Sequence, residues 1–292
     1  MRLAVGNVLT EAAKRAVVDT WMTNNDRHIM RVACLSDVGL TRSLNEDSYR
    51  IDEALGLLLV ADGMGGHDAG EVASRNVVTS IHEYLSRYAD ATDDEATEMM
   101  DGASAEDSDS TWEDLPNPVI GTITAALEYA NQHLYRLNRD RGYPDGHGMG
   151  TTVAGLWRIG ILDEAAIFHV GDSRLYLYRA GRLALLTRDH TLYQQWISSG
   201  RIGPAPSQNI ILRSLGSSAR VNADVRLQSL QQGDLILICS DGLTSMVSDT
   251  RIKSALANAK PDGLQATCES LVAQANAEGG KDNITVLLAW FE

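Results

Sequence analysis

Acidic residues recur in this chain at the points where apolar, strand-like runs begin or end. They are Glu46 and Asp47, Asp62, Asp172, Asp241 and Asp282. One such carboxylate is commonly a turn former or a helix cap, but a set from distant parts of one chain needs another explanation. Carboxylates brought together in a buried place repel one another and resist desolvation, so they require a cation. With oxygen ligands and no Cys/His set, the expected ions are hard ones, Mg²⁺ or Mn²⁺. Two ions roughly 3.5–4 Å apart would suit in-line displacement at phosphorus.

Glycines flank the same acids, in Asp62-Gly63, Gly171-Asp172 and Asp241-Gly242. Glycine permits a close backbone approach, which would let a carbonyl group reach a metal ion. Other catalytic signatures are missing from the sequence: no cysteine has an arginine six positions later, and there is no Walker spacing and no GxSxG elbow. Gly171-Asp172-Ser173 superficially resembles a serine hydrolase motif, but the only later histidine, His190, has no aspartate three residues before it.

The elements that must position these acids are mostly short strands. Apolar runs bounded by turn residues predict strands over 31–39, 55–63, 151–159, 164–171, 174–180, 182–188, 224–230, 234–242 and 283–291. Apolar spacing of three and four residues predicts helices over 69–88, 119–141 and 249–278, with a short helix within 189–220. Ala180-Gly181 is typical of a hairpin turn. The order of these elements favours an α+β fold with two packed antiparallel β-sheets, a β-sandwich flanked by helix pairs.

The charge of the chain is concentrated in one segment. The 292 residues carry a formal net charge of −14, and 11 of the 39 acidic residues lie within 90–114, which has no Lys or Arg. We expect residues 90–115 to form an acidic, flexible insertion that does not touch the metal ions. The overall acidity argues against a nucleic acid or an anionic membrane as the main partner.

The ends of the chain and its cysteines bear on organisation and location. Residues 5–21 have the spacing of an amphipathic helix, so residues 1–29 are expected to be an N-terminal helical extension ahead of a domain over 30–292. No stretch has the apolar length of a signal peptide or a membrane span. Cys34, Cys239 and Cys268 form neither a disulfide framework nor a zinc pattern, which favours a cytoplasmic protein.

Taken together, these motifs resemble the metal-dependent Ser/Thr protein phosphatases of type 2C (the PPM family) in their bacterial form. The matching segments, in the order of the family, are Ser36–Gly39, Arg42–Ser48, Val60–His67 with Gly70-Glu71, Gly148–Thr152, Val170–Arg174, Asp189-His190, Leu215-Gly216, Cys239–Leu243 and Asp282–Thr285. The resemblance covers about residues 31–291, and the whole series is far more specific than any single motif.

The resemblance implies a dinuclear Mn²⁺ or Mg²⁺ site at one end of the β-sandwich, with a possible third ion. Asp62 would bridge both metals, the Gly63 carbonyl and Glu46 would serve one, Asp241 and Asp282 would hold the other, and Asp172 with Asp241 would form the third site. Arg42 would bind the substrate phosphate, while Asp47 and Asn283 would support the ligands. The stretch 191–220 corresponds to the family's flap beside the site, here shortened around Gly203–Ser207.

The implied reaction is hydrolysis of phosphoserine or phosphothreonine in proteins by a metal-activated water, with no phosphoenzyme. Animal relatives place a histidine two residues after the bridging aspartate, where this chain has Met64, so the general acid stays open; structural roles are expected for His67 and His190. The expected partners are phosphorylated proteins and a cognate bacterial Ser/Thr kinase, and the expected state is a monomer.

Two alternative functions remain. The first is a degenerate, non-enzymatic regulator, which is disfavoured because every expected ligand is present. The second is a phosphatase of sigma-factor partner switching, which is disfavoured because the Arg42–Asp47 motif is whole.

Overall fold

Two antiparallel sheets face each other in the computed structural model, which describes residues 30–65, 69–99, 117–158 and 164–292. The first sheet has the strand order β1-β11-β10-β7-β8, and the second has the order β2-β3-β5-β6-β9, with the short β4 paired to β3. The strands are β1 (Met30–Asp37), β2 (Asp47–Asp52), β3 (Leu57–Met64), β4 (Gly150–Thr151), β5 (Val153–Trp157), β6 (Glu164–Val170), β7 (Arg174–Arg179), β8 (Arg182–Leu185), β9 (Asp224–Ser229), β10 (Leu235–Cys239) and β11 (Ile284–Phe291).

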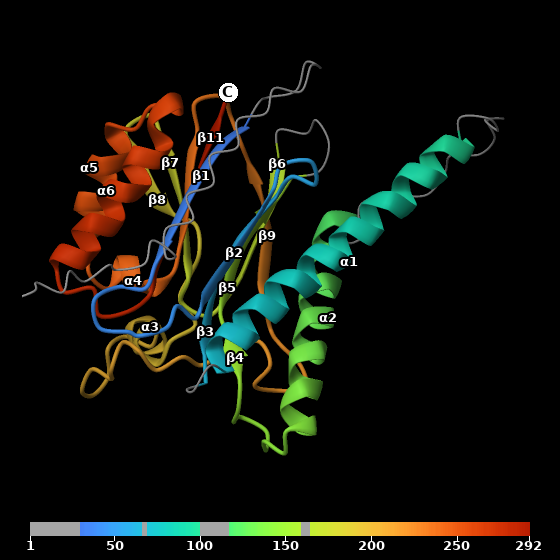
Figure 1. Ribbon diagram of the computed structural model, residues 1–292, viewed down its shortest axis with the longest axis horizontal. Coiled ribbons are helices and arrows are strands. Elements are labelled where there is room, and N and C mark those ends of the chain that lie inside the picture. The colour runs from blue at the N-terminus through green and yellow to red at the C-terminus, as the bar shows by residue number, and fades with distance from the viewer. Residues whose placement is uncertain (1–29, 66–68, 100–116, 159–163) are drawn as a thin grey trace, which may run out of the picture.

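Helices cover the outer face of each sheet (Figure 1). The helices of the described residues are α1 (Ala69–Met99), α2 (Pro118–Asp140), α3 (Leu192–Ser198), α4 (Asp241–Thr244), α5 (Asp249–Ala257) and α6 (Leu264–Ala277), with a 3₁₀ turn over Pro261–Gly263. Helices α1 and α2 pack on the second sheet, while α5 and α6 pack on the first. The expected β-sandwich between helix pairs is therefore confirmed.

The interior consists of three apolar layers, one between the sheets and one beneath each helix pair. Strand β3 shows why: Leu57 and Leu59 face α1 and α2, whereas Leu58 and Val60 face the opposite sheet. Because successive side chains of a strand point to opposite faces, a strand buried on both sides must be apolar throughout. This accounts for the continuous apolar runs in the sequence.

The strand register brings the acid-bearing ends of both sheets to the same edge of the sandwich. In the second sheet Asp47 is the direct cross-strand partner of Asp62. In the first sheet Cys239, at the end of β10, pairs with Val286 near the start of β11. Since every pairing is antiparallel, the end of one strand lies beside the start of the next. The segments that hold Asp47, Asp62, Asp241 and Asp282 therefore converge.

Some predicted elements differ from the structure. Helix α1 continues to Met99, past the predicted end at Tyr88, so residues 90–99 of the predicted insertion are helical. Beyond Tyr88 the sequence becomes polar and acidic, so apolar spacing no longer marks the helix there. Strand β2 and the single turn α4 were missed, since both are short and polar. The hairpin at Ala180-Gly181 is confirmed by positive φ values of 48° and 76°.

Two predicted segments fall outside the described residues, namely the extension over 1–29 and the rest of the acidic insertion over 100–116. Among the residues that are described, no helix combines the length and the apolar character needed to cross a bilayer. All three cysteines are buried and free, as the absence of a disulfide pattern predicted.

Candidate metal centre

The centre is built on Asp62, at the end of β3, and Asp241, the first residue of α4. The two side chains are close enough to share a hydrogen bond. Burial raises the pKa of Asp62 well above its ordinary value, and the charges of Asp47 and Asp241 raise it further. Burial also raises the pKa of Asp241, followed by the charge of Asp282. These carboxylates are thus destabilised as anions and would be relieved by a positive ion among them.

Two buried carboxylate oxygens lack any hydrogen-bond partner among the described residues, Oδ1 of Asp241 and Oδ1 of Asp47. A buried acceptor without a partner is costly, and an ion removes this cost. The atoms available as metal ligands are all oxygens, which suits Mg²⁺ and Mn²⁺ better than softer ions. The residues present therefore fit a divalent ion.

A second part of the centre is formed by Glu46 and Gly63. A side chain at Gly70, in the first turn of α1, would place its Cβ only 2.3 Å from Oε1 of Glu46 and 2.8 Å from the carbonyl oxygen of Gly63. The side-chain oxygen of Glu46 and the carbonyl oxygen of Gly63 therefore both lie close to Gly70, which has no side chain to crowd them. The Gly70 amide donates to Oε1 of Glu46 at 3.1 Å, so the positive end of α1 orients the carboxylate. The sequence motif contains Gly70, but its role depends on how α1 docks.

Gly63 is required by the same docking. A Cβ at Gly63 would lie 2.0 Å from the carbonyl oxygen of Gly70 and 2.7 Å from that of Glu46. The backbone of Glu46 is held by two further bonds, since its carbonyl accepts from the Gly63 amide at 3.2 Å and from the Ser74 hydroxyl at 2.6 Å. The start of α1, the end of β3 and Glu46 are thus fixed as one unit.

Asn283 and Asp47 support these ligands through hydrogen bonds. The amide nitrogen of Asn283 donates to the carbonyls of Val38 and Leu44, at 3.0 and 2.9 Å, and its Oδ1 accepts from the amide of Glu46 at 2.8 Å. One side chain therefore holds the loop from β1 to β2. Oδ2 of Asp47 accepts from the hydroxyls of Ser240 and Thr285, both at 2.7 Å.

Several hydroxyl groups in this network were not assigned roles from the sequence. Besides Ser240 and Thr285, Thr151 donates its hydroxyl to the Asp62 carbonyl at 2.8 Å, and the Asp62 amide donates to the Thr152 hydroxyl at 3.1 Å. The signal was present, because these residues stand next to the acids or in the Gly150-Thr151-Thr152 run. Their partners depend on strand register, which the sequence does not specify.

Arg42 lies at the rim of the centre. Its Nη2 donates to Oδ2 of Asp282 at 2.9 Å, and both side chains are partly exposed, by 48% and 34%. Oδ1 of Asp282 accepts from the amide of Asn283 at 2.9 Å. An exposed guanidinium beside a carboxylate cluster is placed to bind phosphate oxygens that approach from solvent.

Asp172 lies on the turn between β6 and β7 and is buried. Burial raises its pKa to about 7, and the charges of Asp241 and Asp189 contribute. Asp189 is itself held by Arg174 through two hydrogen bonds of 2.9 and 2.7 Å. Gly171 before it has a φ of +102°, and a Cβ there would lie 2.6 Å from the Thr152 side chain. The turn therefore requires glycine to bring Asp172 toward Asp241.

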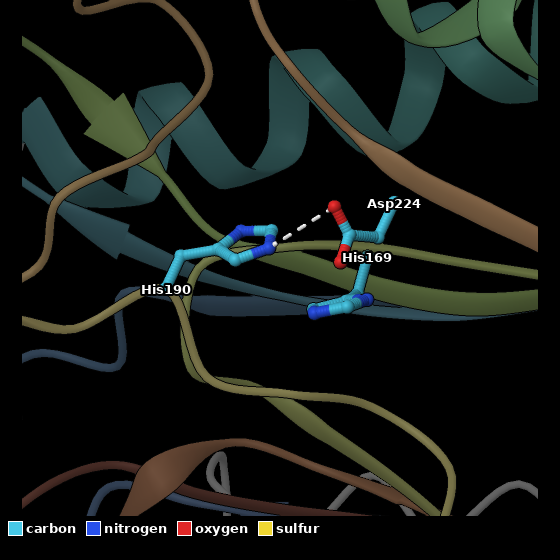
Figure 2. A group of neighbouring side chains, drawn as sticks. All are labelled: His169, His190 and Asp224. Atoms are coloured by element: carbon cyan, nitrogen blue, oxygen red, sulfur yellow. Dashed lines mark ion pairs between the residues drawn. The ribbon is translucent and has the colours of Figure 1, made fainter. Parts of the chain in front are cut away.

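One ring nitrogen of His190 points toward the carboxylate of Asp224 (Figure 2). Its Nδ1 accepts from the Gly171 amide at 3.1 Å, and its Nε2 lies 3.4 Å from Oδ1 of Asp224. The ring stacks on His169 with centroids 4.5 Å apart. Burial, with the charges of His169 and Arg213, lowers the pKa of His190 to about 4, so it is neutral at pH 7. His67 lies outside the described residues.

The group His169, His190 and Asp224 has the spacing of a metal site, but its chemistry argues against one. Nη1 of Arg213 lies 3.1 Å from both the His190 Nε2 and the Asp224 Oδ1, so a guanidinium already occupies the position of the cation. Because Nδ1 of His190 faces an N–H group, the proton of the neutral ring belongs on Nε2, which leaves no lone pair there. The group instead joins β6 and β9 to the segment that follows His190.

Comparison with known proteins identifies the class. Residues 41–288 match the model of the family described as Protein phosphatase 2C. Protein phosphatase PhpP of Streptococcus pneumoniae is 35% identical over 268 residues, covering 89% of this chain and 96% of that protein. The crystal structure of the PstP catalytic domain in complex with two manganese ions has a TM-score of 0.70 at 32% identity, covering 90% of this chain and 98% of that one. PppA, described as a key regulatory component of T6SS in Pseudomonas aeruginosa, gives a TM-score of 0.70 at 28% identity, covering 90% and 98%.

The chain belongs to the protein phosphatase 2C family. It is a metal-dependent Ser/Thr protein phosphatase of the bacterial type, and the family uses Mn²⁺ or Mg²⁺ in a dinuclear centre.

Proposed function

We propose that the two ions of this phosphatase are held by Asp62 as the bridge, by Glu46 and the Gly63 carbonyl on one side, and by Asp241 and Asp282 on the other. The observation that carries this assignment is the pair Asp62 and Asp241, buried together with an Asp241 oxygen that has no partner among the described residues. Asp172, facing Asp241, is the proposed ligand of a third ion.

Bound divalent ions would lower the pKa of a water molecule for attack on phosphorus and would neutralise charge on the phosphoryl oxygens. Arg42 orients the phosphate, since its guanidinium has free N–H groups beyond the one that binds Asp282. Asp47 and Asn283 keep the β2 and β11 segments in place through the hydrogen bonds described above. Met64 has no proton to give to the departing alkoxide, so another group must supply that proton.

The proposed substrates are proteins phosphorylated on serine or threonine by a bacterial kinase, with this chain acting as a cytoplasmic monomer. Named relatives that are Ser/Thr phosphatases support the substrate class. Three buried, unpaired cysteines support a reducing compartment.

The purified protein is expected to hydrolyse p-nitrophenyl phosphate and a phosphothreonine peptide, and EDTA should abolish both activities because the carboxylates alone cannot activate water. Excess Mn²⁺ should restore them. The measurement is phosphate release, with bound metal quantified in the same samples. A protein that holds two ions and yet turns over neither substrate would contradict the proposal.

Arg42→Ala is expected to lower kcat/KM for the phosphothreonine peptide by about a hundredfold, since charge-assisted hydrogen bonds contribute about 1.5–3 kcal/mol each. Arg42→Lys should recover part of the loss, because it keeps the charge without the bidentate fit. Arg251→Ala is the matched control: that arginine, on α5, is similarly exposed and also binds one carboxylate, Glu278. Equal activity of Arg42→Ala and Arg251→Ala would remove Arg42 from the phosphate site.

A further inference from the structure

Residues 190–223 form an acid-free segment in an otherwise acidic chain. These 34 residues contain no Asp or Glu, whereas the whole chain has 39 in 292, and they include Arg201, Arg213 and Arg220. Arg213 binds Asp224, but neither Arg201 nor Arg220 has an ion pair with any residue that the structure describes. The segment therefore offers positive charge that the rest of the fold does not neutralise.

The acid-free segment is anchored at the metal centre by both of its ends. At the first end, the His190 amide donates to the Gly171 carbonyl at 2.8 Å, next to Asp172. At the other end, Leu215 and Thr151 exchange two backbone hydrogen bonds of 2.9 and 3.2 Å. Thr151 in turn donates its hydroxyl to the Asp62 carbonyl. Both His190 and Leu215 thus connect the acid-free segment to backbone that carries a proposed metal ligand.

A strained turn displays two side chains on this segment. Arg201 has a φ of +59°, and among the described residues the only other non-glycine with a positive φ is Ala180, in the β7–β8 hairpin. The indole of Trp196 donates to the carbonyls of Ile202 and Gly203, at 3.1 and 3.2 Å, and the Arg201 amide donates to the Trp196 carbonyl at 2.9 Å. Such a backbone conformation costs about 1–3 kcal/mol and persists only where the surroundings hold it.

This turn holds the aliphatic side chain of Ile202 in solvent, next in sequence to the positively charged Arg201. Ile202 is 81% exposed, the highest value among the large apolar side chains of the described residues. Ile210 and Leu212, further along the same segment, are 44% and 49% exposed. Leu40, which is 69% exposed, belongs to the loop that carries Arg42. Exposed apolar groups of this kind, next to unpaired arginines, are typical of an interaction surface.

We propose that Arg201 and Ile202 of the acid-free segment select phosphorylation sites flanked by an acidic residue and an aliphatic residue. This inference rests on the proposed function. The choice of occupant follows from charge complementarity: a phosphorylated, acidic segment meets unpaired arginines here, whereas the remainder of the chain is strongly acidic.

The test uses phosphothreonine peptides of equal length that differ only in their flanks: glutamate with isoleucine, lysine with isoleucine, or glutamate with serine. The wild-type protein should show its lowest KM for the first peptide, and added salt should reduce its preference over the second. Arg201→Gly keeps the left-handed turn while removing the charge, and should raise that KM by about fivefold. Ile202→Ser should raise it by about tenfold. In both variants kcat should stay unchanged, and Arg201→Lys should restore the preference for glutamate.

Arg182→Gly and Leu185→Ser are the matched controls, because they remove an exposed arginine and a half-exposed leucine from β8, outside the acid-free segment. Hydrolysis of p-nitrophenyl phosphate separates the two proposals: its absence would refute the phosphatase function, whereas its presence with equal KM values for all peptides and variants would overturn only the selection by Arg201 and Ile202. Binding of the wild type to vesicles of anionic phospholipid, lost in Ile202→Ser, would instead show that the segment binds a membrane and would also overturn the proposal.

Discussion

Asp241→Asn is expected to lower kcat/KM for a phosphothreonine peptide by at least about a thousandfold and, at the same time, to stabilise the metal-free protein. Both effects have one cause. The Asp241 carboxylate is buried beside Asp62, with an oxygen that has no partner among the described residues. It is suited to an ion and unfavourable without one. The amide removes a buried negative charge and supplies an N–H donor for Asp62, but it is a much weaker ligand.

The control is Asp234→Asn. Asp234 is also a buried aspartate, but it accepts two hydrogen bonds from Arg179, at 2.7 and 2.5 Å, and one from the Gln231 amide at 2.8 Å. Replacing it leaves Arg179 without its charged partner, so this variant should lose stability and keep its activity. Thermal unfolding in EDTA, measured for both variants with activity in Mn²⁺, gives the comparison. If Asp241→Asn destabilises the metal-free protein as Asp234→Asn does, then the Asp241 carboxylate stabilises the fold without metal, which contradicts the prediction.

The second large effect concerns the pH dependence of stability in the metal-free protein. The pKa of Asp172 is raised to about 7 in the folded state, above the value of about 3.9 for an unfolded chain. The folded protein therefore binds more protons at this residue between about pH 4 and 7, so the contribution of Asp172 to stability falls as the pH rises through that window. A shift of this size corresponds to at most about 4 kcal/mol.

Asp172→Asn isolates this contribution. Without metal, the variant should match the wild type near pH 4 and exceed its free energy of unfolding near pH 8, by at most about 4 kcal/mol. His169 and His190, whose pKa values are lowered by burial, affect stability in the opposite sense, but they are present in both proteins and cancel in the difference. Urea unfolding in EDTA at both pH values provides the measurement. A difference that does not change with pH would show that Asp172 is not an uncompensated buried acid.

The sequence indicates which acids lie at strand ends, but it does not indicate which side chains hold them there. Acids at strand ends could be recognised because burial and turn formation leave a direct pattern, and the structure does bring Asp62 and Asp241 together. The hydrogen bonds from hydroxyl groups to Asp47 could not be predicted from the sequence, because they depend on which residues of β2, β10 and β11 face one another. The same limit applies to Gly70, whose position beside Glu46 and Gly63 follows from the docking of α1.

The errors in the fold have a similar origin. Strand β2 is short and polar, and it is recognisable only through its pairing with β3, in which Asp47 meets Asp62. Helix α1 continues past Tyr88, where the apolar spacing predicted its end, because backbone hydrogen bonds extend a helix without needing an apolar period in the sequence.

The division of the proposed ligands between the two sheets has a mechanical consequence. Asp62 belongs to the second sheet, whereas Asp241 and Asp282 flank strands of the first, and an apolar layer packs between the two sheets. Ions held by both sets would act as a cross-link at one end of the sandwich. Any sliding of one sheet over the other would change the distances between the ligands. The packing between the sheets therefore sets the spacing of the two metal ions. Substitutions at Val60 or Ile238, which fill that layer, would then retune metal affinity without touching a ligand.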